Sequence, residues 1–364
     1  MCADTLFSPI NVRGTSIRNR LWVSPMCQYS VEKLDGVPTP WHFAHLGSFA
    51  RGGAGLVMSE ATAVSPEGRI SSWDTGLWNG VQQEAWRGIV DFIHSQGAKA
   101  AVQLCHAGRK ASSYREWSGQ GTQPVEDGGW EMVAPSALAF DGYAVPRALT
   151  EAEIGEIVAD FGRAAGRALE AGFDAIELHA AHGYLLHQFL SPLSNRRTDG
   201  YGGSLQGRAR FLLETVSEVR RVAGESVPLF VRFSATDWAG EEGWNVEDTI
   251  TTARWAAREG ADWFDISTGG LVPNVRIPVG PKYQVGFATR VKEGTGYPVN
   301  AVGLITTSQD AAQIVETGEA DAVMVGREFL RDPHFALRAA HELGVEIDYW
   351  PPQYTRGKWR RPRA

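Results

Sequence analysis

Short apolar segments alternate with helix-like segments along most of this chain, and this alternation is the feature that most constrains its fold. Eight apolar segments can be placed, at residues 19–24, 55–59, 99–104, 174–178, 228–233, 263–267, 298–302 and 321–325. Such runs are typical of parallel strands buried on both faces, and helices between them imply crossover connections. Eight units favour a closed barrel, and the absence of a Gly-x-Gly-x-x-Gly turn after the first segment weakens a dinucleotide-binding fold. We therefore predict an α/β fold in which residues 1–364 form a single-domain (β/α)8 TIM barrel.

The segments between the predicted strands carry helix signals. Thr150 and Glu153 form a capping box that opens a helix ending at Ala171, and Ser204 is the expected N-cap of a helix over 204–223. Apolar periodicity and terminal glycines predict further helices over 41–51, 83–96, 246–259, 284–293, 307–317 and 333–343. Residues 111–149 are irregular and rich in Gly, Pro, Ser and Trp, so we predict an excursion over one face after strand three, with a hairpin or a lid as alternatives.

Composition limits the classes of function. The chain has 364 residues, 43% of them hydrophobic, which is enough for a large core, and a net charge of −7 that argues against a nucleic-acid partner. Three cysteines, Cys2, Cys27 and Cys105, give no disulfide framework and fit a reducing compartment. Residues 1–7 show no leader, and no apolar run approaches the ~18 residues that a membrane span needs. We expect a soluble cytoplasmic protein without a membrane partner.

Residues capable of chemistry follow several of the predicted strands. In a barrel of this type the reacting groups sit at the carboxyl ends of the strands. Two imidazoles, His179 and His182, can bind one oxygen there, and the phenol of Tyr184 can deliver a proton. The other strands supply Ser24, Cys27 and Tyr29; Glu60 and Ala61; Gln103; Arg232; Gly303; and Gly326 with Arg327. The loops after strands seven and eight are a common phosphate site of this fold, so they are the expected phosphate cradle.

Several ordered motifs together carry a family resemblance. They are Ser24-Pro25-Met26-Cys27-Gln28-Tyr29, Gln103 followed by His106-Ala107-Gly108-Arg109, His179-x-x-His182-Gly183-Tyr184, residues 195–203, and Gly326-Arg327. The set resembles the Old Yellow Enzyme family of FMN-dependent ene-reductases and covers nearly the whole chain. The pair Cys27 and Tyr29, with the two histidines, is similar to the bacterial thermophilic-like branch, which includes the xenobiotic reductases.

The resemblance implies a tightly bound, non-covalent FMN and a role for each matching residue. Ser24, Pro25, Met26 and Cys27 would line the flavin, Ala61 and Gln103 would contact its ring, Arg232 would lie near N1, and Gly303, Gly326 and Arg327 would hold the phosphate. The substrate would be bound by Tyr29, His179, His182 and Tyr184, and by Arg356 of a neighbouring subunit in a homodimer or homotetramer joined through the tail at 345–364.

The implied reaction is the reduction of an activated alkene, such as an enone, enal, maleimide or nitroalkene. NAD(P)H, with NADPH favoured, would reduce FMN; hydride would then pass to the β-carbon, and Tyr184 would protonate the α-carbon, with ping-pong kinetics. Some relatives carry a tryptophan where Val302 stands here, so the pocket of this chain is expected to be wider.

Simpler interpretations stay open for each residue. The histidine pair can be a metal site, although no third ligand lies at a useful spacing; Tyr184 can be packing, Arg232 an ion-pair partner and Cys27 an inert thiol. The basic run 356–363 can be a solvated tail, and His42, His45 and His106 are expected to be structural.

Three other functions compete with this one. A dienoyl-CoA reductase type of flavin barrel needs a cysteine-rich iron–sulfur segment. A barrel lyase needs a Schiff-base lysine at a strand end, where none is expected. A binding protein without catalysis would hold no yellow flavin.

Overall fold

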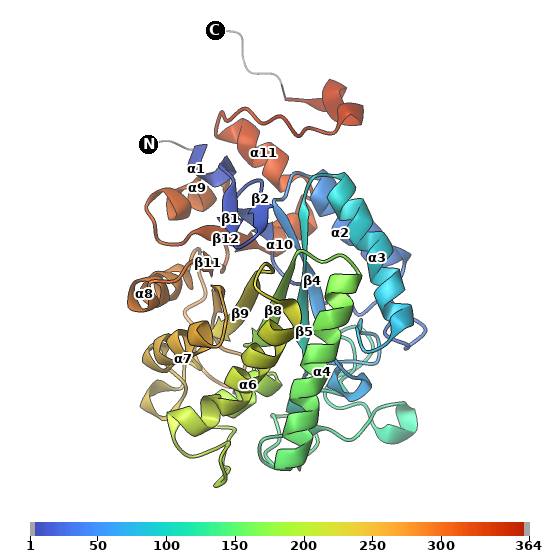
Figure 1. Cartoon of the computed structure of the whole chain (residues 1–364), viewed down its shortest axis with the longest axis vertical. Helices are drawn as coiled ribbons and strands as arrows, with labels where there is room; N and C mark the ends of the chain where they lie inside the picture. The colour runs from blue at the N-terminus through green and yellow to red at the C-terminus, as the bar shows by residue number, and fades with distance from the viewer. Residues whose placement is uncertain (1–3, 360–364) are drawn as a thin grey trace.

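The computed structural model describes residues 4–359, and its core is a closed barrel of eight parallel strands (Figure 1). The neighbours around the barrel follow the order β10-β11-β12-β3-β4-β5-β8-β9. The strands are β3 (Leu21–Val23), β4 (Leu56–Ala63), β5 (Lys99–Cys105), β8 (Ala175–Ala180), β9 (Leu229–Ser234), β10 (Trp263–Ser267), β11 (Val299–Ala301) and β12 (Ala322–Val325). The predicted (β/α)8 barrel is confirmed, and all eight predicted strands are present.

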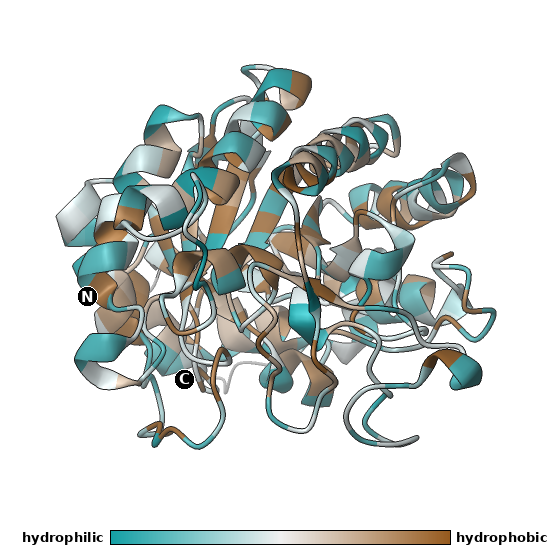
Figure 2. Cartoon of the chain, turned by 90° about the horizontal axis from the view of Figure 1, so that it is seen from below, coloured by the Kyte–Doolittle hydropathy of each residue, from teal (hydrophilic) through white to brown (hydrophobic). Residues whose placement is uncertain are grey.

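Helices surround the barrel and turn their apolar faces toward it (Figure 2). They are α2 (Pro40–Arg51), α3 (Gly80–Ser95), α4 (Glu151–Glu170), α6 (Leu205–Ala223), α7 (Val246–Arg258), α8 (Val285–Thr295), α9 (Ser308–Glu316) and α11 (Phe335–Glu342). The predicted capping box is confirmed, because Thr150 Oγ1 accepts from the Glu153 amide at 3.3 Å and the Glu153 carboxylate accepts from the Thr150 amide at 2.8 Å. Ser204 is likewise the N-cap of α6.

Strand alternation sorts the barrel interior into layers along its axis. Trp22, Phe230 and Trp263 form an aromatic floor in which the Trp22 and Trp263 rings lie 5.1 Å apart. The hairpin of β1 (Ile10–Val12) and β2 (Thr15–Ile17) packs Val12 and Ile17 against this floor. Two residues further along β9 and β10 come the buried polar side chains Arg232 and Asp265, and two further still come Ser234 and Ser267. On these two strands the barrel therefore presents its polar side chains toward the carboxyl ends.

The structure differs from the sequence prediction in several local features. Strand β8 runs two residues beyond the predicted end, so His179 lies inside the strand and not in the following loop. The short helices α5 (Leu185–Leu190) and α10 (Arg327–Arg331) were not predicted. His42 and His45 lie within α2, and the structural role expected of His42 is visible in the helix cap, where its ring accepts from the Thr39 amide at 2.9 Å.

The excursion at residues 111–149 is largely irregular, as predicted. It contains one 3-10 turn, Val125–Asp127, and the two-residue strands β6 (Val133–Ala134) and β7 (Arg147–Ala148). These strands pair in parallel, so they do not form a hairpin with each other. The expected lid role stays a prediction.

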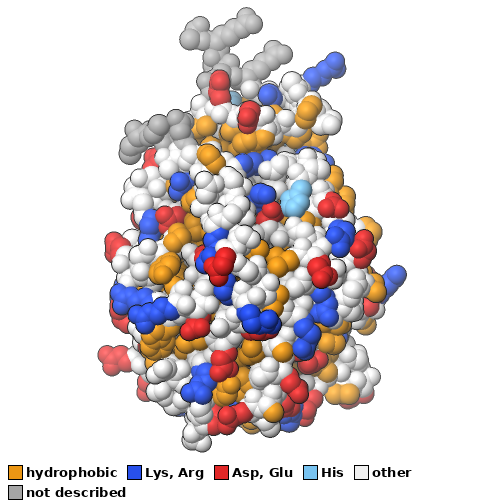
Figure 3. All heavy atoms as spheres, in the orientation of Figure 1, with side chains coloured by type: hydrophobic (Ala, Val, Ile, Leu, Met, Phe, Trp, Pro, Cys, Tyr) orange, Lys and Arg blue, Asp and Glu red, His pale blue; other side chains and the backbone are white. Residues whose placement is uncertain are grey.

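Basic and acidic side chains are interspersed on the face shown in Figure 3. Within residues 4–359, no helix combines the length and the apolar character that crossing a bilayer requires. Cys27 and Cys105 are free thiols. Cys2 and residues 360–363 of the basic run lie outside the described residues.

Candidate active site

The site is organised around a left-handed turn that follows strand β8. His182 has a φ of 58° and Gly183 a φ of 75°, a region of backbone space that costs a non-glycine residue roughly 1 kcal/mol or more. Side-chain hydrogen bonds hold the turn: the His182 amide donates to Ser234 Oγ at 3.0 Å, Lys110 Nζ donates to the His182 carbonyl at 2.9 Å, and Gln188 Nε2 donates to the Gly183 carbonyl at 2.7 Å. The turn aims His182 and Tyr184 at the barrel mouth from either side of Gly183.

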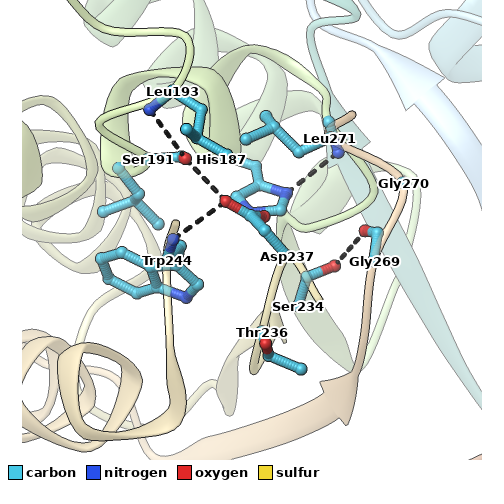
Figure 4. Close-up of polar contacts among 12 residues, drawn as sticks. His187, Ser191, Leu193, Ser234, Thr236, Asp237, Trp244, Gly269, Gly270 and Leu271 are labelled. Carbon is cyan, nitrogen blue, oxygen red and sulfur yellow. Dashed lines mark hydrogen bonds and ion pairs between the residues drawn. The ribbon is translucent and has the colours of Figure 1, made fainter. Parts of the chain in front are cut away.

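A buried polar network behind the turn supports it (Figure 4). The Gly183 amide donates to His187 Nδ1 at 3.0 Å, which leaves the proton of a neutral ring on Nε2. His187 Nε2 lies 3.0 Å from Asp237 Oδ1, close enough for an electrostatic contact but out of line for a hydrogen bond. Ser191 Oγ donates to the other carboxylate oxygen at 2.6 Å. Because the serine contacts the carboxylate and not the imidazole, this is a supporting network and not a nucleophilic triad.

The three predicted catalytic rings lie together. The His179 and His182 rings are 5.1 Å apart at 86°, and the His179 and Tyr184 rings are 4.9 Å apart at 72°. His182 Nε2 lies 2.8 Å from Ser267 Oγ, which fixes the ring. His179 Nδ1 is buried without a hydrogen-bond partner in the protein. The histidine pair thus offers ring nitrogens to a ligand.

Protonation suits these groups to hydrogen bonding and proton transfer. Burial, and then the charge of Arg232, lowers the pKa of both His179 and His182 well below the usual value, so both imidazoles are neutral at pH 7. Burial raises the pKa of Tyr184 well above its usual value, with the nearby Cys27 thiol adding to the effect. The Tyr184 phenol therefore keeps its proton until a strong base forms beside it.

A cavity of about 270 Å³ reaches Ser267, the contact partner of His182, and is lined by most of the predicted phosphate and flavin residues. Ser24, Met26, Arg232, Gly303, Gly326 and Arg327 all line it, as does Val302. In the pairing of β8 with β9, His179 stands opposite Arg232, so the imidazoles and the guanidinium share one mouth. Arg232 Nη2 lies 3.4 Å from Ser24 Oγ, while its Nε lies 2.9 Å from Asp265 Oδ2. The arginine is therefore an ion-pair partner and a cavity residue at once.

The remaining predicted flavin residues lie along the adjoining strands. Ala61 of β4 pairs with Gln103 of β5, and Gln103 Nε2 donates to Glu177 at 2.7 Å. Cys27, Tyr29 and Tyr184 pack against the apolar cluster that contains Ala61 and Cys105. Pro25 connects Ser24 to Met26, both of which line the cavity. Burial raises the pKa of Cys27, so its thiol is neutral.

Two basic side chains remain to be placed: Arg356, predicted to enter the mouth of a neighbouring subunit, and Lys110, which was not predicted. Arg356 is exposed in the 3-10 turn Pro352–Gly357, in a tail that packs against α11 through His341 and Trp359, so this chain builds its mouth without it. Lys110 was missed, because it follows β5 by five residues and reaches the site only through the fold. Its ammonium lies 5.2 Å from the Tyr184 ring centre and donates to the His182 and Gly270 carbonyls.

Burial, and then the charge of Arg109, lowers the pKa of Lys110 to about 8, so the amine is mostly protonated at pH 7. The sequence places Lys110 directly after the His106–Arg109 motif, which is the signal that could have found it. Within residues 4–359, no three histidine, cysteine or carboxylate side chains gather as a metal site.

The barrel and its mouth define a class of protein: an α/β barrel with a cavity and a group of buried titratable side chains at the carboxyl ends of its strands. The sequence model of the NADH:flavin oxidoreductase / NADH oxidase family matches residues 5–346. The chain belongs to this family, and it is an FMN-dependent oxidoreductase. The Old Yellow Enzyme resemblance is thereby confirmed.

Individual relatives agree with this placement. The chain is similar to an NADPH dehydrogenase of Listeria innocua, 49% identical over 356 residues, which are 98% of this chain and 99% of the relative. It also resembles the solved Old Yellow Enzyme homologue of Zymomonas mobilis, with 29% identity, a TM-score of 0.77 and coverage of 97% and 98% of the two chains. A solved 2-naphthoyl-CoA reductase matches with 26% identity and a TM-score of 0.86 over 94% of this chain, but this chain spans only 53% of that one.

Proposed function

We propose that this protein is an NADPH-dependent ene-reductase, which adds a hydride and a proton across the double bond of an activated alkene such as an enone, enal, maleimide or nitroalkene. The observation that carries the proposal is the convergence of two neutral imidazoles and a protonated phenol at the mouth that Arg232 also faces. The naming of curated relatives as NADPH dehydrogenases supports NADPH as the reductant.

The residues around the cavity fit FMN. Arg327 and the glycines 303 and 326 would hold its phosphate, where a cation and two small residues border one cavity. Ser24 and Arg232 would supply polar donors further in, and Gln103, Ala61, Pro25, Met26 and Cys27 would contact its ring. When bound, FMN accepts hydride from NADPH and supplies hydride to the alkene.

The side chains of the mouth have complementary tasks. His179 and His182 would donate hydrogen bonds to the carbonyl or nitro oxygen of the substrate, because each neutral ring carries one N–H and His179 Nδ1 has no protein partner. These bonds strengthen as negative charge builds on the oxygen. Tyr184 would protonate the α-carbon, and Tyr29, which packs in the same cluster, would bound the substrate.

The direct test is an anaerobic titration of the holoenzyme, first with NADPH and then with cyclohexenone, followed by flavin absorbance. Bleaching followed by recovery is expected, with parallel double-reciprocal plots in steady state because both substrates use one mouth. Tyr184→Phe should retain FMN and bleach normally but recover about 10²–10⁴-fold more slowly, whereas Tyr297→Phe, at an exposed tyrosine, should match the wild type. A yellow protein that cyclohexenone fails to reoxidise would refute ene-reduction.

We also propose that the chain forms a homodimer or homotetramer through its tail at 345–364, with Arg356 entering a neighbouring mouth. Support comes from the exposed position of Arg356 on a tail that packs on α11. Truncation after Tyr349 should lower the oligomeric state in size-exclusion chromatography and raise the KM for the alkene. An unchanged oligomer with full activity would end this idea. The free thiols of Cys27 and Cys105 suit a cytoplasmic location, which we propose.

A further inference from the structure

The polar layer inside the barrel holds more acidic than basic side chains. Glu177 of β8 and Asp265 of β10 are both fully buried, and Arg232 of β9 lies on the strand between them. All three point inward, two residues along their strands from the aromatic or small side chains of the floor. The reaction outlined above uses Arg232 but gives neither carboxyl group a task.

The contacts of the two acids are unequal. Asp265 Oδ2 lies 2.9 Å from Arg232 Nε, at ion-pair distance although out of line for a hydrogen bond, and both Asp265 oxygens lack hydrogen-bond partners. Glu177 Oε1 accepts one bond from Gln103 at 2.7 Å, and Glu177 Oε2 is buried without a partner. The arginine is thus committed to Asp265, and Glu177 has only a neutral amide for support.

One guanidinium cannot neutralise two buried carboxylates. The groups that face Glu177 are Gln103 from β5, Arg232 from β9, Asp265 from β10 and the neutral His179 from its own strand. Burial, and then the charge of Asp265, raises the pKa of Glu177 to about 8, and burial also raises the pKa of Asp265. A buried second carboxylate in such a group is more stable with a proton than as an ion.

We propose that Glu177 holds a proton in the resting enzyme. Because protonated Glu177 is neutral, only Asp265 offsets the charge of Arg232 when an electron pair enters the cavity above. The inference rests on the proposed function, because it needs FMN in the cavity that Arg232 lines. Glu177 is in this view a positioning residue for charge: it acts through Arg232 and touches neither substrate nor cofactor.

The proposal couples the electron pair to a proton. Arg232 extends from Asp265 to Ser24, so its guanidinium is shared between the polar layer and the cavity. If Glu177 loses its proton, the layer carries two negative charges against one positive charge, and added negative charge in the cavity is disfavoured. By thermodynamic reciprocity, electron uptake must then strengthen the hold on the Glu177 proton by the same factor.

The test is the reduction potential of the holoenzyme between pH 6 and pH 10. In the wild type, the slope of the reduction potential against pH should become steeper above about pH 8. The added slope should correspond to the uptake of one additional proton per electron pair. Glu177→Gln keeps the shape of the side chain and a fixed neutral charge, so its potential should follow the low-pH line across the range. Glu241→Gln, at an exposed glutamate, should reproduce the wild-type bend. A bend that survives unchanged in Glu177→Gln overturns the proposal.

Two further measurements distinguish a failure of this proposal from a failure of the proposed function. Asp265→Asn removes the like charge beside Glu177, so the bend should move to lower pH; a bend that stays in place contradicts the proposed coupling. Infrared difference spectra between pH 7 and pH 9 should show the loss of a protonated carboxyl band in the wild type but not in Glu177→Gln. Absence of that band from the wild type overturns the proposal whatever the flavin does. A flavin that NADPH cannot reduce would instead refute the proposed function.

Discussion

Gly183 provides a sharp test of the turn that carries His182 and Tyr184. A Cβ added at Gly183 would lie 2.3 Å from the Gly270 carbonyl oxygen and 2.9 Å from Leu271 Cα, and the φ of Gly183 is 75°. The contacts are backbone atoms, which cannot rotate away, so the turn or the Gly269–Leu271 segment must move. Gly183→Ala therefore combines a conformational cost with a steric one.

The two costs can be separated with a matched control. Gly203 has a φ of 68°, but a Cβ there would meet nothing within 4 Å. Gly203→Ala should therefore cost only the left-handed conformation, about 1 kcal/mol. Gly183→Ala adds the displacement of packed backbone, typically ~1–3 kcal/mol, so we expect a total loss of roughly 2–4 kcal/mol.

Urea unfolding of the two holoenzymes at 25 °C and pH 7 measures this difference, and alkene reduction measures its functional consequence. Because a misplacement of ~1 Å at reacting groups can cost 10²-fold in rate, Gly183→Ala should lose activity at least tenfold, while Gly203→Ala should keep it. Equal losses of stability in the two variants would refute the claim that the approach of Gly270 dictates a glycine at 183.

Other expectations follow from single contacts. Thr150→Ala removes the capping box of α4 and should lower the free energy of unfolding by ~1 kcal/mol without changing activity, as measured by urea unfolding and steady-state rates. The pKa of Glu177 is raised to about 8 in the folded chain, against ~4.3 when unfolded. The folded state therefore binds a proton that the unfolded state has lost between these values. Stability should fall as pH rises through that window, by up to ~1.4 kcal/mol per unit, and an equal slope in Glu177→Gln would contradict the assignment. Cys27→Ala should shift the flavin potential while FMN stays bound, because Cys27 packs beside Ala61 at the mouth; an unchanged potential would reject that role.

The barrel could be predicted from the sequence because each of its strands is marked by a local residue pattern with recognisable ends. The predicted range 263–267 matches β10 at both ends, since Asp262 and Thr268 bound a short segment that holds Trp263, Phe264 and Ile266. The end of β8 could not be found in this way. His179 and Ala180 pair with Arg232 and Phe233 of β9, so a partner distant in sequence extends the strand past its apolar stretch.

The missing pieces share a dependence on tertiary contacts. Helix α5 has six residues that are all buried, so it shows no amphipathic period from which a helix could be predicted. Lys110 and Asp237 reach the turn at His182 from other loops, and their role is set by backbone carbonyls and by the His187 ring, which no motif encodes. The side chains at the barrel mouth were predictable by type, whereas those that hold them in place were not.

The layers of the barrel connect these observations. Inward positions on β9 run from Phe230 to Arg232 to Ser234, and on β10 from Trp263 to Asp265 to Ser267. The aromatic floor excludes water from below, which strengthens every charge interaction in the layer above it. An arginine placed there acts strongly on the cavity, but it also requires a buried counter-ion such as Asp265. A second acid in that layer is stable only in its protonated form. The exclusion of water that strengthens the effect of Arg232 on the cavity therefore also favours the protonated form of Glu177.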